Sequence, residues 1–186
     1  MNLNNILPGK NLPNNFNVII EISANSDPVK YEIDKNTGMI LVDRFLSTSM
    51  CYPCNYGYIP KTLVEDGDPI DVLVLTPFPL IPGCIISCRA IGLLKMIDTG
   101  SVDIKILSVP INEVCPIYSN IKSFKDIPNL ILEQIKHFFE HYKDLEKNKF
   151  IKIEKWEDSK IAKEKILFSA LEYKNKFLYS LIILLK

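Results

Sequence analysis

Asp66-Gly67-Asp68-Pro69-Ile70-Asp71 is the most informative stretch of this 186-residue chain. Its three carboxylates repel one another, so their proximity favours a bound cation. Gly67 and Pro69 bend the chain, which lets the acidic side chains converge instead of alternating along a straight strand. Hard divalent cations such as Mg²⁺ take oxygen ligands. The segment therefore predicts either a cation site or a solvated acidic turn.

A second polar group follows at Asp98, Asp103 and Lys105, around a turn that contains glycine. Asp103 and Lys105 are two residues apart, so in a strand they lie on the same face. The pair indicates either a surface ion pair or a metal ligand beside a phosphate-binding ammonium. Upstream, Glu21 interrupts the apolar run 18–22. A charged group there is costly unless it is paired or liganded.

Much of the first two thirds of the chain is rich in Val and Ile and punctuated by Gly, Pro, Asn and Asp, a pattern typical of strands. Lys35–Gly38 is a typical hairpin turn between two of them. Because no helical pattern separates the strands, we expect a β-barrel and not a parallel α/β sheet. The predicted strands are Asn17–Ile22, Val29–Asp34, Ile40–Asp43, Ile70–Leu75, Cys84–Leu94 and Val102–Val109.

The last third changes to a helical period. Asp126 is a candidate N-cap with Pro128 in the first turn, and apolar residues then recur at three- and four-residue steps. A second helix is predicted from Asp158 or Ser159. We therefore expect a mainly β fold with α-helices at its C-terminal end, in one domain that spans residues 1–186.

An apolar C-terminal extension occupies residues 177–186. It is too short to cross a bilayer, which takes about 20 residues. It either lengthens the last helix onto the barrel, packs on a neighbouring subunit, or contacts a membrane surface, and the first two are favoured. We expect no membrane partner.

The composition limits the functional classes. Lys plus Arg equals Asp plus Glu at 22 each, so the chain lacks the basic excess of a general nucleic-acid or membrane-surface binder. Five cysteines, an odd number, fit free thiols in a reducing compartment. Met1–Leu12 has no apolar signal-peptide stretch, so we expect a cytoplasmic protein.

Arg44 and a group of tyrosines, Tyr52, Tyr56 and Tyr58, precede the acidic segment. Arginine offers planar, forked donors to phosphate, and tyrosine hydroxyls add neutral donors. Near carboxylates that hold cations, such donors suit a polyanionic substrate. Taken singly, each tyrosine is more often a core or rim aromatic.

Together these segments resemble the soluble inorganic pyrophosphatases of the bacterial, magnesium-dependent type (family I). Residues 66–71 match the family signature Asp-x-Asp-Pro-x-Asp, and similarity continues through Val42–Phe45, Tyr52–Tyr58 and His137–Glu146. The resemblance implies a five-stranded OB-type β-barrel with flanking C-terminal helices. It also implies hydrolysis of inorganic pyrophosphate to two orthophosphates, with several Mg²⁺ ions per active site, in a homohexamer.

The resemblance further implies roles for individual residues. Asp68 matches the residue that orients and deprotonates the attacking water. The implied metal residues are the Mg²⁺ ligands Asp66, Asp71, Asp98 and Asp103, with Glu21 and Glu32 supporting metal or water. The implied phosphate-holding residues are Lys30, Arg44, Tyr56, Lys105, Tyr142 and Lys143. One departure is Thr99, where many relatives have an acidic residue.

Two other functions fit parts of the sequence. His137-Phe138-Phe139-Glu140-His141 matches the H-x-x-E-H pattern of inverted zinc peptidases, but such a site needs a third protein ligand. An OB-fold nucleic-acid-binding module could use the tyrosines as a stacking platform, but the zero net charge and the clustered Asp residues count against it. The expected partner is therefore the small molecule pyrophosphate and no nucleic acid.

Overall fold

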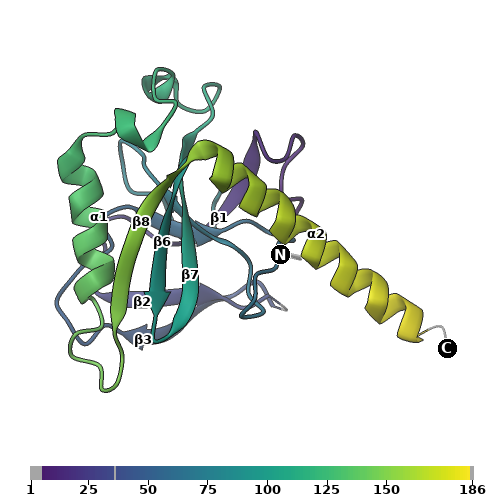
Figure 1. The fold of residues 1–186 in the computed structure, drawn as a ribbon, viewed down its shortest axis with the longest axis horizontal. Coiled ribbons are helices and arrows are strands. Elements are labelled where there is room, and N and C mark those ends of the chain that lie inside the picture. Colours follow the sequence, from purple (N-terminus) through teal and green to yellow (C-terminus); the bar gives the residue numbers. More distant parts are fainter. Residues whose placement is uncertain (1–5, 36, 185–186) are drawn as a thin grey trace.

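The architecture is a ring of β-strands followed by α-helices (Figure 1). The structure, a computed structural model, describes residues 6–35 and 37–184. The strands are β1 (Phe16–Ile22), β2 (Val29–Ile33), β3 (Ile40–Phe45), β4 (Asn55–Tyr58), β5 (Asp71–Val74), β6 (Ile85–Asp98), β7 (Ser101–Pro110) and β8 (Ile151–Asp158). The helices are the 3₁₀ turns η2 (Pro116–Tyr118) and η3 (Phe124–Asp126), followed by α1 (Asn129–His141) and α2 (Ser159–Leu184).

Five strands close into a ring in the order β1–β4–β5–β7–β6, because β6 also pairs with β1. The length of β6 makes this possible, since residues 85–88 pair with β1 and residues 92–98 pair with β8. Within the ring only β5 and β7 run parallel. The predicted mainly β fold, a five-stranded OB-type arrangement with C-terminal helices, is confirmed.

Alternating side chains of the ring strands fill two cores. Val72 of β5 and Ile106 of β7 pack with Ile166 of α2 in one core. Their neighbours Leu73 and Leu107 pack in the other core, which α1 covers. The period of two along each strand thus places one helix against each face, as Figure 1 shows for α1 and the start of α2.

Several predicted elements are confirmed. Most of the predicted strands lie within a residue or two of the observed ones, and β6 continues past its predicted end to Asp98. β2 and β3 pair antiparallel through the predicted hairpin, where Gly38 has a φ of 74°. Asp158 caps the start of α2, because its Oδ1 accepts hydrogen bonds from the backbone N–H groups of Lys160 and Ile161.

Other predictions need correction. β4 was missed because it is short and contains a glycine, and β8 was missed because charged residues alternate along it. The predicted N-cap of α1 is wrong: the helix begins at Asn129, and Asp126 instead forms a capping box with Ser123 in η3. Pro128 cannot donate a backbone hydrogen bond and marks the break between η3 and α1.

The C-terminal extension lengthens α2, which is helical as far as Leu184; residues 185–186 lie outside the described part. The C-terminal part of α2 projects away from the ring (Figure 1). Leu178 is 64% exposed there. Among the described residues, no helix has the length and apolar character needed to cross a membrane.

Candidate active site

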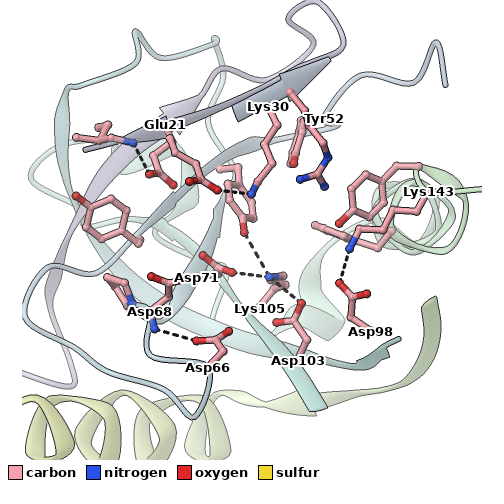
Figure 2. A pocket seen from close by; sticks show the side chains of 18 of the residues that line it. Glu21, Lys30, Tyr52, Asp66, Asp68, Asp71, Asp98, Asp103, Lys105 and Lys143 are labelled. Carbon is pink, nitrogen blue, oxygen red and sulfur yellow. Dashed lines mark hydrogen bonds and ion pairs between the residues drawn. The ribbon is translucent and has the colours of Figure 1, made fainter. Parts of the chain in front are cut away.

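A cavity of about 240 Å³ gathers every residue to which the family resemblance gave a role (Figure 2). Strands β1 to β7, the turn before β5 and the C-terminal end of α1 all contribute to its wall. Those lining residues are Glu21, Lys30, Glu32, Arg44, Tyr56, Asp66, Asp68, Asp71, Asp98, Asp103, Lys105, Tyr142 and Lys143. Residues distant in sequence therefore meet in one mixed acidic and basic site.

Lys105 lies at the centre of this cavity and is buried (Figure 2). Its Nζ is 2.5 Å from Asp71 Oδ2 and 2.9 Å from Asp103 Oδ2, and it donates to the Tyr56 hydroxyl at 3.3 Å. The parallel pairing of β5 and β7 sets Asp71 directly opposite Lys105. Burial works against the charged ammonium, but Asp71 and Asp103 outweigh it and raise the pKa of Lys105.

A second ion pair closes one side of the cavity. Lys143, just after α1, places its Nζ 2.5 Å from Asp98 Oδ2. Thr99 donates from its hydroxyl to Asp98 Oδ1 at 2.9 Å. Burial raises the pKa of Asp98, but these two donors outweigh it, so the pKa is lowered overall. Thr99 therefore holds the Asp98 carboxylate instead of adding a negative charge of its own.

Glu21 is the most buried carboxylate of the site, with 8% of its surface exposed. Burial raises the pKa of Glu21 to about 8, although its Oε1 accepts a hydrogen bond of 2.9 Å from the Ile33 N–H. On the neighbouring hairpin, Lys30 pairs with Glu32 and lies 3.3 Å from Asp43 Oδ2. The Glu21 carboxyl group in the apolar strand β1 is thus buried and accepts a backbone hydrogen bond from the hairpin that carries Lys30 and Glu32.

The acidic turn bends as the sequence predicts. Gly67 has a φ of 93°, and Asp66 Oδ1 accepts from the Asp68 N–H at 2.9 Å. Asp68 Oδ1 lies 2.5 Å from Lys35 Nζ. Lys35 also lines the cavity, but no sequence signal predicts it, because it lies in an exposed hairpin turn.

Arg44 contributes a guanidinium group to the site. Its Nη1 donates to Asp43 Oδ2 at 2.7 Å, and its Nε lies 3.6 Å from Glu146 Oε1. Within the described residues, these Nε and Oε1 atoms are buried and have no hydrogen-bond partner. Glu146 follows α1 in the same turn region as Lys143. Its contact with Arg44 therefore holds the guanidinium group on the side of the cavity where Lys143 lies.

The donor set suits a hard divalent cation, because seven carboxylates meet in one cavity. In residues 6–35 and 37–184, however, no three His, Cys, Asp or Glu side chains are arranged to hold a metal ion as they stand. The ion pairs explain this, since ammonium groups contact Asp71, Asp103, Asp98 and Asp68. The lysine ammonium groups supply the positive charge that a metal ion would supply. The carboxylates therefore fit a divalent cation once their contacts with the lysines rearrange.

The histidine motif lies elsewhere. His137 and His141 are neighbours on α1, with ring centroids 4.7 Å apart and the rings tilted at 49°, and His141 Nδ1 is 2.8 Å from Asp144 Oδ2. Neither histidine lines the acidic cavity. The described part of the chain places no third ligand with them, which counts against the zinc peptidase interpretation.

The ring of strands and its mixed acidic and basic cavity have clear relatives among known proteins. A sequence model of the family described as "Inorganic pyrophosphatase" matches residues 18–174. The inorganic pyrophosphatase of Escherichia coli K12 is 54% identical over 176 residues, which cover 95% of this chain and 100% of that protein. The chain therefore belongs to the inorganic pyrophosphatase family.

Solved structures agree with this assignment. The chain is similar to an inorganic pyrophosphatase from Coxiella burnetii, with a TM-score of 0.87 and 52% identity over 90% of this chain and 99% of that one. It is also similar to an inorganic phosphatase from Anaplasma phagocytophilum, with a TM-score of 0.89 and 48% identity over 91% of this chain and 99% of that one. The resemblance found in the sequence is confirmed.

Proposed function

We propose that this protein hydrolyses inorganic pyrophosphate to two orthophosphates. The supporting observation is that a single cavity combines seven carboxylates with lysine, arginine and tyrosine donors. The carboxylates suit divalent cations, and the donors suit the two phosphoryl groups of a small polyanion. Membership of the inorganic pyrophosphatase family supports the same reaction.

In this mechanism Asp68 is the general base. Its carboxylate lies at the cavity wall on a bent, exposed turn, where it can accept a proton from a water that attacks one phosphorus atom. The cationic and tyrosine side chains hold both phosphoryl groups in line for displacement and neutralise charge on the leaving oxygen. These residues are Lys30, Arg44, Tyr56, Lys105, Tyr142 and Lys143.

We propose Mg²⁺ as the metal, held by Asp66, Asp71, Asp98 and Asp103, with Glu21 and Glu32 in support. When bound, Mg²⁺ supplies a water of lowered pKa and neutralises phosphate charge. The ion pairs of Lys105 and Lys143 neutralise three of these carboxylates, Asp71, Asp103 and Asp98, in this structure.

The first test is orthophosphate release from pyrophosphate by purified protein, with Mg²⁺ and with EDTA. Rapid release that requires Mg²⁺ supports the proposal, and no release from folded protein refutes it. Asp68→Asn keeps the shape of the side chain but removes the base, so turnover should fall by roughly 10²- to 10⁴-fold. Mg²⁺ should raise the melting temperature of Asp68→Asn as much as it raises that of the wild type. It should raise the melting temperature of Asp71→Asn by less. Unchanged turnover in Asp68→Asn would show that its assigned role is wrong.

We also propose that residues 1–186 act as one pyrophosphatase domain and assemble as a homohexamer. Large exposed apolar side chains support assembly, since Phe45 is 73% exposed and Phe78 and Ile81 are each 78% exposed. Sedimentation equilibrium tests this proposal, and a monomeric mass at micromolar concentration would contradict it. The cytoplasmic location stays a prediction.

A further inference from the structure

A second concave surface adjoins the active-site cavity. It consists of two cavities of about 280 and 80 Å³, whose linings share Lys35, Thr62, Pro69 and Tyr173. Lys176 lines the larger cavity, and Lys61 lines the smaller one. Because the linings overlap, we treat them as one surface, termed the lysine groove. The larger cavity is close to the lower end of the range for small-molecule sites.

The charge of the lysine groove indicates what it binds. Its described lining includes three lysines and no carboxylate, although the chain as a whole has no net charge. Tyr173 contributes an aromatic side chain, and Pro69 adds an apolar one. Ammonium groups bind phosphate as point charges, and a tyrosine ring stacks on flat apolar groups. The combination suits a phosphate monoester that carries a flat ring.

The acidic turn is the wall between the two sites. Gly67 lines the lysine groove, and the next residue, Asp68, lines the active-site cavity. Lys35 lines both and lies 2.5 Å from Asp68 Oδ1. The two side chains are 53% and 68% exposed, so their ion pair is weak and an anion in the groove can compete for Lys35.

We propose that the lysine groove binds a phosphate monoester with a flat ring, such as a nucleoside monophosphate, and that binding draws Lys35 away from Asp68. Asp68 Oδ1 is then free to accept a hydrogen bond from water, which raises turnover. This effect on turnover rests on the proposed role of Asp68, whereas the binding itself does not. Lys176 lies beyond residues 18–174, the part of the chain that the family model matches.

Isothermal titration calorimetry of AMP against the full chain in EDTA tests the binding. Lys61→Gln and Lys176→Gln should each weaken AMP binding by roughly three- to tenfold, because each removes one charge-assisted contact to phosphate. Lys174→Gln is the matched control, since Lys174 is exposed on the same helix and does not line the groove. Adenosine, which lacks the phosphate, should not bind. The proposal is overturned if AMP fails to bind at about 10 mM, or if both groove variants bind it as wild type does.

Turnover of pyrophosphate with Mg²⁺ tests the link to the active site. AMP should raise the turnover of the wild type, and Lys61→Gln should need a higher AMP concentration for the same effect while keeping its basal rate. Without AMP, Lys35→Gln should hydrolyse pyrophosphate at the rate that the wild type reaches with AMP. AMP binding with unchanged turnover overturns the Lys35 link. Binding without any pyrophosphate hydrolysis would refute the proposed function and leave the groove supported.

Discussion

Replacing Lys105 with Met should destabilise the metal-free protein and increase its response to Mg²⁺. The variant leaves Asp71 and Asp103 facing each other without the ammonium that lies 2.5 and 2.9 Å from them. Breaking a fully buried ion pair costs about 3–5 kcal/mol. The side chains of Asp71 and Asp103 are 28% and 25% exposed, so water recovers part of this and we expect about 2–3 kcal/mol. For a chain of this size, that corresponds to a fall in melting temperature of roughly 5–10 °C.

Thermal denaturation at one fixed protein concentration, in EDTA and then with added Mg²⁺, measures both effects. Lys105→Met should gain more from Mg²⁺ than the wild type, because the ion replaces the lost positive charge. Lys95→Met is the control, since Lys95 forms a surface pair with Glu154 at 2.8 Å and both side chains are 35% exposed. An equal response of Lys105→Met and wild type to Mg²⁺ would refute the view that Lys105 supplies charge where the cation binds.

Three further predictions concern positions around the cavity. Glu146→Gln removes the charge beside Arg44 Nε, so KM for pyrophosphate should rise several-fold with a smaller change in kcat; an unchanged KM would contradict this positioning role. Gly57→Ala should abolish soluble expression, because the added Cβ would lie 2.0 Å from a backbone oxygen of β1; a folded variant by circular dichroism would contradict this. With a thiol reagent at pH 8, exposed Cys51 should react in the native protein, whereas Cys54 should react only after unfolding, because burial raises its pKa to about 12; equal rates would contradict this.

The sequence predicts the local parts of the site well. Gly67 and Pro69 predict the bend of the acidic turn, because their backbone preferences act within a few residues. The two-residue spacing of Asp103 and Lys105 predicts a shared strand face, and the two side chains do form an ion pair. Such signals depend on nearest neighbours along the chain, which a single sequence contains.

Contacts between distant segments are harder to predict. The pairing of Asp71 with Lys105 depends on the parallel register of β5 and β7, which no local pattern specifies. Lys35 and Glu146 lie in loops, where an ion pair forms through the folded geometry and not through sequence periodicity. β8 also escapes detection, because its charged side chains alternate on a half-exposed edge.

Closure of the ring makes the site a property of the complete chain. The cavity takes its wall from β1, near one end of the chain, and from Lys143, near the start of the last quarter. Pairing of β1 with β6 brings segments about 70 residues apart into register, a step that folds slowly compared with local hairpins. A chain that ends before Lys143 therefore lacks part of the site. Recovery of activity after denaturation therefore reports closure of the ring itself.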